Sequence, residues 1–133
     1  MAIKRDALHA VFSNCIRLAA GCCERCHKKG RLENSHFIGR RSKSVRWFPN
    51  NCTATCGGCH RFFGEHPFEH TIFMQLKLGL GVFDDLVRRG KIARKYTTQD
   101  RKEMRAHYKE ELKRIQALRD NGFEQDLILI PWD

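Results

Sequence analysis

Two pairs of cysteines are the residues of this chain whose type and spacing point most directly to chemistry. Cys23 and Cys26 form one pair, Cys56 and Cys59 form the other, and two residues separate the members of each pair. Thiolates at this spacing are typical ligands of a tetrahedral zinc ion, and four of them leave no position open for a substrate. The two pairs therefore predict a structural zinc site that holds the segment between them in place.

The three remaining cysteines lie outside this pattern. Cys22 adjoins Cys23 and is an alternative ligand, but only Cys23 has the two-residue spacing to Cys26. Cys15 and Cys52 are predicted to be small buried apolar groups. An odd total of seven cysteines, with four of them in C-x-x-C pairs, favours zinc binding in a reducing compartment over a disulfide framework.

Three polar residues inside or beside the cysteine pairs could perform hydrolysis. His36 is the candidate general base, because a neutral imidazole near pH 7 can take a proton from water. Asn51 follows it, and His60 adjoins the predicted zinc ligand Cys59. His60 would therefore be held on a rigid backbone, where it could bind a second, catalytic divalent metal. The competing interpretation is that both histidines are ordinary surface or core residues.

The sequence around these residues resembles that of HNH endonucleases, which have the ββα-metal, or His-Me finger, fold. The resemblance covers about residues 23–66 and rests on two stretches, Glu33-Asn-Ser-His36-Phe and Trp47-Phe-Pro-Asn-Asn51-Cys-Thr-Ala-Thr-Cys56-Gly-Gly-Cys59-His60. A looser similarity to phage recombination endonucleases of the NinG (Rap) type rests on Ser35-His-Phe-Ile-Gly-Arg-Arg41 and Tyr108-Lys-Glu-Glu-Leu112.

The resemblance implies a role for each matching residue. His36 matches the general base, Asn51 matches the asparagine that orients it, and His60 matches a ligand of the catalytic metal, for which Mg²⁺ or Mn²⁺ is expected. The family usually has an aspartate ligand directly before the base, where this chain has Ser35, and a hydroxyl is a poorer ligand for a hard cation. Either the metal is held more weakly, or Glu65 or His66 supplies the missing group.

The charge of the chain indicates a polyanionic partner. The 133 residues have a formal net charge of +10 at pH 7, which is typical of proteins that bind nucleic acids or anionic membranes. We predict that DNA is the partner. The cations expected to contact its phosphates beside the base are Arg40, Arg41, Lys43 and Arg46, and a second, distal basic cluster is formed by Arg88, Arg89, Lys91, Arg94 and Lys95.

The elements that must hold these residues follow from apolar periodicity and turn residues. Apolar side chains at helical spacing predict a helix over residues 3–20, which Gly21 would end. Short strands are predicted over 31–38 and 45–48, on either side of a basic loop, and a short helix would then carry the second cysteine pair. This order makes a ββα unit, in which zinc would hold His36 and His60 across the hairpin from one another.

Helices are also predicted for most of the second half of the chain. Pro67 suits the first turn of one helix, which Gly79 or Gly81 would end. A further helix is predicted over 82–89, and Thr97 or Thr98 would cap a long last helix that ends near Asn121. The apolar segment 127–132 is too short to form a core, so it would pack back on the domain or meet a partner.

These patterns together predict an α+β, mainly helical fold around a zinc-bound ββα-metal core. We expect a single domain over 1–133, with an N-terminal helix in 1–22, the core in 23–66 and a helical extension in 67–133. No apolar run approaches the roughly 20 residues that span a bilayer, and the polar N-terminus has no secretory h-region. We therefore expect no membrane contact and a cytoplasmic location, in the host cell if a phage encodes the chain.

The leading hypothesis is a metal-dependent HNH endonuclease that nicks DNA, leaves 5′-phosphate and 3′-hydroxyl ends, and acts in phage recombination or packaging. The alternative is a zinc-stapled DNA-binding module without activity, which Ser35 favours. A zinc-dependent protein-interaction scaffold would explain the cysteines but neither the charge nor the central histidine. A homodimer is one arrangement that the last helix and the tail would allow, and it would let two single-strand cuts make a double-strand break.

Overall fold

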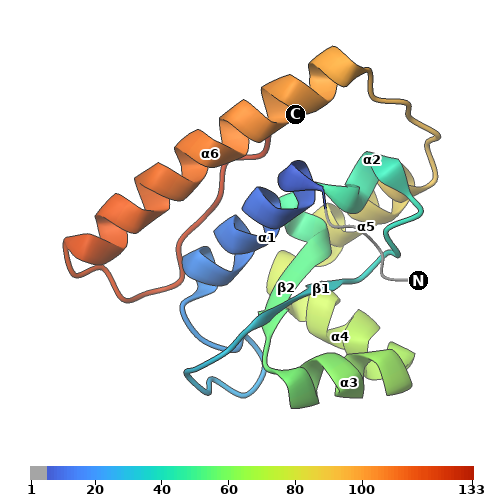
Figure 1. Cartoon of the computed structure of the whole chain (residues 1–133). Helices are drawn as coiled ribbons and strands as arrows, with labels where there is room; N and C mark the ends of the chain where they lie inside the picture. The colour runs from blue at the N-terminus through green and yellow to red at the C-terminus, as the bar shows by residue number, and fades with distance from the viewer. Residues whose placement is uncertain (1–5) are drawn as a thin grey trace, which may run out of the picture.

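The computed structural model describes residues 6–133 and is shown in Figure 1. Most of the chain is helical, and the two strands form one antiparallel sheet, which confirms the predicted α+β class. In chain order the elements are α1 (Ala7–Ala20), β1 (Glu33–His36), α2 (Lys43–Arg46), the 3-10 turn η1 (Pro49–Asn51), β2 (Cys52–Thr55), α3 (Gly57–Glu65), α4 (Pro67–Leu78), α5 (Leu80–Gly90) and α6 (Thr98–Asp120).

The sheet lies between two layers of helices. In Figure 1, α1 and α6 lie on one side of the strands, and α3 and α4 lie on the other. Cys52 and Ala54 of β2 pack into the apolar cluster that α1 and α6 form, while the hydroxyl of Thr53 lies 3.4 Å from the sulfur of Met74 in α4. Because helices cover both faces, all four residues of β2 are buried.

The second strand is the one element that the sequence placed wrongly. It was predicted over 45–48, but β2 occupies Cys52–Thr55, and residues 43–46 form the single turn α2. The hydroxyl of Ser44 donates to the carbonyl of Arg89 at 2.7 Å, and Val45 is buried against α4 and α5. These contacts hold the segment as a turn on the end of α5 and leave it no strand partner.

The helix predicted over 3–20 is present as α1, and residues 3–5 lie outside the described part of the chain. Asp6 caps its first turn by accepting a hydrogen bond from the backbone N–H of His9 at 2.7 Å. Gly21 ends it in the left-handed region, with a φ of 76°. The buried face of α1 packs on α6, mainly through Phe12 and Tyr108, whose rings meet edge to face at 4.9 Å.

The later helices are confirmed with small shifts of their ends. Gly79, with a φ of 81°, separates α4 from α5. Thr97 caps α6 through a capping box with Asp100. Within residues 6–133, no helix is both long enough and apolar enough to cross a membrane.

The apolar tail packs back on the molecule. The N–H of Leu127 donates to the carbonyl of Ala19 at 2.9 Å, at the end of α1, and the N–H of Ile130 donates to the carboxylate of Glu111 at 2.6 Å, on α6. Leu129 is buried in the cluster between these helices. The sequence allowed the tail either to pack back on the domain or to meet a partner, and in the structure it packs back on the domain.

Candidate metal centre and active site

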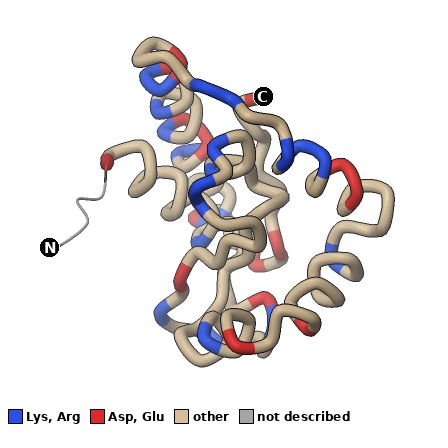
Figure 2. The backbone as a smooth tube through the Cα atoms, turned by 90° about the vertical axis from the view of Figure 1, so that its right-hand side faces the viewer, with Lys and Arg blue, Asp and Glu red and all other residues tan. Residues whose placement is uncertain are grey.

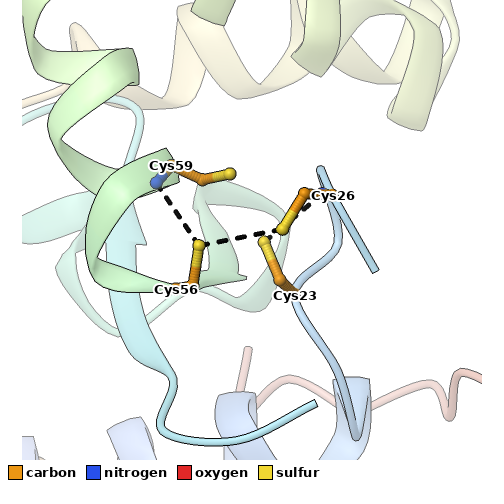
Figure 3. Close-up of side chains that lie close together, drawn as sticks. All are labelled: Cys23, Cys26, Cys56 and Cys59. Atoms are coloured by element: carbon orange, nitrogen blue, oxygen red, sulfur yellow. Dashed lines mark hydrogen bonds between the residues drawn. The ribbon is translucent and has the colours of Figure 1, made fainter. Parts of the chain in front are cut away.

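The four cysteines of the two C-x-x-C pairs come together in space, as Figure 3 shows. Their sulfur atoms lie within 4.8 Å of one another, and the sulfurs of Cys26 and Cys56 are 3.8 Å apart. Zinc–sulfur bonds of about 2.3 Å place the sulfurs of a tetrahedral site about 3.8 Å apart. The cluster therefore has the size and the donor set that a zinc ion needs.

Local backbone geometry forms each half of this cluster. After Cys26 the chain turns through His27, which has a positive φ of 66°, and the N–H of His27 donates to the carbonyl of Cys23 at 2.8 Å. The sulfurs of Cys23 and Cys56 each accept a backbone N–H at 3.5 Å, from the second cysteine of the pair. Cys56 thus caps α3 while its sulfur faces the other pair.

The cysteines outside the pairs have a different chemistry. Cys15 and Cys52 are buried, as predicted, and burial raises the pKa of each thiol to about 12. Neither thiol belongs to the cluster of four sulfurs, so position sets these two cysteines apart from the predicted zinc ligands. Cys22 does not belong to the cluster, so the spacing argument identified the correct member of the Cys22–Cys23 pair.

The first cysteine turn is attached to the sheet. The backbone N–H of Glu24 donates to the carbonyl of Ala54 at 2.9 Å, and its carboxylate accepts the N–H of Ala54 at 2.6 Å. Lys77 of α4 lies 2.9 Å from the same carboxylate and also donates to the carbonyl of Cys52 at 2.9 Å. A metal held by the four cysteines would therefore join α3 to a turn that is already anchored on β2.

His36, the predicted base, lies at the end of β1 with one ring nitrogen already engaged. Its Nε2 is 3.0 Å from the carbonyl oxygen of Arg46. A carbonyl only accepts, so Nε2 must carry the proton and Nδ1 keeps its lone pair. Burial lowers the pKa of His36 to about 4, against the raising effect of that hydrogen bond, and the charges of His9, Arg40 and Arg46 lower it further. The ring is therefore neutral near pH 7.

His9, on α1, is a neighbour of His36 that the sequence did not single out. The two rings stack with centroids 6.4 Å apart and planes 16° from parallel. His9 is 9% exposed, and its Nε2 lies 3.2 Å from a guanidinium nitrogen of Arg40. It was missed because only packing of α1 on the sheet brings it to His36.

Asn51 lies fully buried behind the basic loop. Its side-chain oxygen accepts the N–H of Ile38 at 2.8 Å, and its amide nitrogen donates to the carbonyls of Ile38 at 2.9 Å and Val45 at 3.2 Å. These bonds join Ile38 and Val45, at the two ends of the basic loop, through the one side chain of Asn51. Since Ile38 follows His36 by two residues, Asn51 also fixes the backbone that carries the imidazole.

His60 is paired with a carboxylate that the sequence analysis gave no role. Its Nδ1 lies 2.7 Å from Oε1 of Glu33, and each side chain is 43% exposed. A carboxylate that accepts from one imidazole nitrogen leaves the other free as a ligand, and such pairs commonly flank metals. Glu33 precedes Ser35 by two residues and therefore shares its face of β1, which is the signal that could have identified it.

The structure places His36 and His60 on different faces of the sheet. Glu33, which bonds His60, pairs with Thr55, whereas His36 pairs with Cys52. Alternate residues of a strand face opposite sides, and three residues of strand span about 10 Å. His36 therefore lies on the α1 side of β1, whereas His60, on α3, reaches the same strand from the opposite side through Glu33.

The additional ligands expected beside His60 form no recognised metal cluster with it in the described part of the chain. Ser35 is 2% exposed and lies opposite Thr53. Glu65 follows His60 by five residues on α3, which turns its side chain about 140° away, and Nδ1 of His66 donates to the carbonyl of Phe62 at 2.9 Å. In the described part of the chain, the four cysteines are the only group of three or more His, Cys, Asp or Glu side chains that could hold a metal.

The predicted phosphate contacts surround His36 in part. Arg40, Arg41 and Lys43 are exposed. Arg46 is half-buried and its guanidinium lies 4.9 Å from the ring of Trp47. The distal basic cluster is partly neutralised, because Arg89 and Arg94 both pair with Asp133 and Arg88 pairs with Asp85. Figure 2 shows Lys and Arg on many elements of the chain rather than on one.

A groove of about 1570 Å³ lies beside these residues. Its lining comes from α1, β1 and α6, with His60 and Arg40 beside them. Glu33 and Asn34 both line it although they face opposite sides of the sheet, so the groove crosses β1 at this point. It thus extends from the Glu33–His60 pair to the neighbours of His36.

Comparison with known proteins adds no relative: no protein-family model, no curated protein and no solved structure matches the chain.

Proposed function

We propose that the protein is a metal-dependent endonuclease of the HNH type that hydrolyses DNA phosphodiester bonds. The observation that supports this best is the state of His36. Its imidazole is neutral near pH 7 because burial lowers its pKa to about 4, its Nε2 is bound to the Arg46 carbonyl, and its Nδ1 keeps the lone pair that a general base requires.

In the proposed reaction, Nδ1 of His36 takes a proton from a water whose oxygen bonds to phosphorus. The bond between phosphorus and the 3′ oxygen breaks, and that oxygen takes a proton from solvent. Arg40 and Arg46 lie near enough to lower the pKa of His36 through their charge, and the same charge favours a phosphate beside the ring. Asn51 holds the backbone that carries the imidazole through three hydrogen bonds. In this reaction the two arginines would bind the phosphate, Asn51 would orient the imidazole, and His36 would deprotonate the water.

Two metal sites accompany this proposal. Zinc at Cys23, Cys26, Cys56 and Cys59 would stabilise the fold and supply no chemistry, because the site is closed. Glu33 and His60 would hold a Mg²⁺ or Mn²⁺ ion with water in its other positions, as such ions prefer, and when bound it supplies positive charge at the phosphate. Glu33 would thus supply the carboxylate that the resemblance leads one to expect at position 35, where this chain has Ser35.

The second candidate is a zinc-stapled DNA-binding module without activity. It is favoured by the separation of the two histidines, since His36 and the Glu33–His60 pair lie on different faces of the sheet. For the nuclease, a phosphate must reach both across the edge of β1. The proposed products are nicks with 5′-phosphate and 3′-hydroxyl ends, and the proposed context is phage recombination or packaging.

Nicking of supercoiled plasmid in Mg²⁺ or Mn²⁺ distinguishes the candidates. We expect the wild-type protein to nick, His36→Ala and His60→Ala to lose activity, and His66→Ala to keep it, because His66 is an exposed histidine whose Nδ1 bonds its own helix. Nicking that persists in His36→Ala would overturn the assigned base. If the wild-type protein binds DNA but cuts in neither ion, the binding module is correct.

A further inference from the structure

We infer that the groove between α1, β1 and α6 binds the sugar–phosphate backbone of duplex DNA. This inference rests on the proposed function and identifies the surface that brings the substrate to the site. Much of this surface is formed by α1 and α6, which lie outside the segment 23–66 that contains the two cysteine pairs. The basic loop over 40–46 would then contact only one end of the bound duplex.

The position of the groove is the first reason. It contains both Glu33 and His60 and also His9 and Arg40, and the His9 ring stacks on His36. The groove therefore contains the Glu33–His60 pair and two neighbours of His36. A strand that lies in it passes the Glu33–His60 pair and the His36 neighbours in turn.

The charge of the groove is the second reason. Five cationic side chains line it and only two carboxylates do. One of these carboxylates, Glu33, is bound to His60, and the other, Asp120, accepts from the amide of Gln116 at 2.9 Å. The cations are Arg17, Arg31, Arg40, Lys113 and Arg119. Lys113 lies 3.2 Å from Glu110 on its own helix, which offsets part of its charge. The guanidinium of Arg119 donates to four backbone carbonyls, and the groove keeps a net positive charge.

The helix α1 sets the distance between the His36 neighbours and the contact at Arg17. His9 is buried and marks the start of this distance rather than a contact, and Arg17 follows it by eight residues, at 1.5 Å of helix per residue. Arg17 is therefore about 12 Å from His9, which corresponds to three or four nucleotides of duplex at 3.4 Å each. Contacts would extend several nucleotides to one side of the cut.

The kind of side chain in the groove indicates a duplex rather than an unpaired strand. Proteins that bind single strands stack bases on aromatic side chains. Among the described residues that line the groove, none is Phe, Trp or Tyr, whereas Asn14, Asn34 and Gln116 offer amides. Amides and cations suit phosphates and sugars, which carry no sequence information. We therefore expect weak sequence preference and strong dependence on salt.

Fluorescence anisotropy with a labelled 25-base-pair duplex tests the inference. The groove variant is R17A/R31A/K113A, which leaves the proposed active-site residues in place. The matched control is K102A/R105A/K109A, which removes three exposed cations that neither line the groove nor belong to the distal basic cluster. Both variants lose the same net charge, so a general effect of charge acts equally on both. Circular dichroism and thermal unfolding check that each variant folds.

We expect the groove variant to bind the duplex at least about 30-fold more weakly than the control at 0.1 M salt. We also expect its slope of log affinity against log salt to be smaller by about 2 to 3, since each lost phosphate contact removes about 0.9. Equal losses in the two variants, or a larger loss in the control, would overturn the groove assignment. If the groove variant unfolds, K113E against K102E replaces the triple variants, with the same expected order.

A matching 25-nucleotide single strand supplies the second comparison. We expect the wild-type protein to bind it at least about tenfold more weakly than the duplex, and equal or tighter binding would overturn the duplex assignment. The plasmid assay separates the two proposals. A wild-type protein that nicks DNA while the groove variant binds like the control refutes the groove alone. A wild-type protein that neither binds nor nicks DNA refutes the proposed function, and the groove assignment with it.

Discussion

The carbonyl of Arg46 determines which nitrogen of His36 is available for chemistry. Because Nε2 must donate to that carbonyl, Nδ1 keeps its lone pair whatever the ring does elsewhere. Burial lowers the pKa of the ring, and the positive charges around it lower that pKa further, so the ring stays neutral near pH 7. The sequence alone does not show which nitrogen of His36 carries the proton, because the partners that decide it lie on other elements: His9 on α1, Arg40 in the loop after β1, and Arg46 on α2.

Buried histidines also predict how stability depends on pH. Burial lowers the pKa of His36 and of His70 from 6.5 to about 4. Unfolded histidines bind protons near pH 6.5 while these two stay neutral, so stability is full above pH 6.5 and falls as the pH drops towards 4. The slope is at most about 1.4 kcal/mol per pH unit for each histidine. Urea unfolding between pH 4 and 7.5, with zinc present, measures it.

His70→Phe is the matched variant for this measurement. The His70 ring already stacks on that of Phe63 at 4.1 Å, and its Nε2 has no hydrogen-bond partner among the described residues. We expect the variant to be as stable as the wild-type protein at pH 7.5 and to lose less stability in acid. The same pH profile in both proteins would contradict the assignment to His70.

Substitutions of Ser35 test whether this side chain or Glu33 takes the place of the expected aspartate. It is 2% exposed and lies on the face of β1 that helices cover. We expect Ser35→Asp to lower the free energy of unfolding by about 3 kcal/mol, because the new carboxylate would be buried and lose its hydration. Ser35→Ala should cost less than about 1 kcal/mol. A Ser35→Asp protein with full stability and faster nicking would show instead that this side chain reaches the metal.

Among the elements, the sequence predicted the helices well and the second strand poorly. The caps at Gly21, Gly79 and Thr97 are local signals, and α1, α4 and α6 begin or end at them. β2 has no such signal, since helices cover both of its faces and remove the alternation of polar and apolar residues that marks a half-exposed strand. Val45 and Phe48 were apolar enough to suggest a strand, but they belong to the turn on α5.

The zinc frame can be tested with neighbouring cysteines. We expect Cys23→Ser to lose the bound zinc and to unfold at a much lower temperature, because a structural zinc site contributes directly to folding. Cys22→Ser should keep both the zinc and the stability, since Cys22 lies outside the cluster. Zinc content by mass spectrometry and thermal unfolding measure this. Equal zinc content in the two variants would show that Cys23 is not a ligand.

Two adjacent residues of the apolar tail over 127–132 provide a second matched pair of variants. Leu129 is 8% exposed and Ile128 is 85% exposed, although they are adjacent. We expect Leu129→Ala to lower the free energy of unfolding by about 2 to 3 kcal/mol, and Ile128→Ala to change it by less than about 0.5 kcal/mol. Urea unfolding of the two variants checks this. Equal effects would mean that the tail does not pack on α1 and α6 in solution.

For the molecule as a whole, the packing of helices around the sheet determines which residues lie beside His36 and His60. The zinc ligands follow from spacing, and Asn51 lies where it can fix the loop after His36. The partners His9 and Glu33, and the groove along α1 and α6, depend on how distant segments meet. Charge predicted a polyanionic partner but not a surface, because Lys and Arg are spread over many elements (Figure 2).

The most direct measurement is the single-turnover rate of plasmid nicking by His36→Ala, with and without added imidazole. If His36 is the general base, its loss should slow nicking by about 10²- to 10⁴-fold. Imidazole should then restore part of the rate in the variant and leave the wild-type rate unchanged. A His36→Ala protein that nicks as fast as the wild-type protein would contradict the proposed function of this histidine.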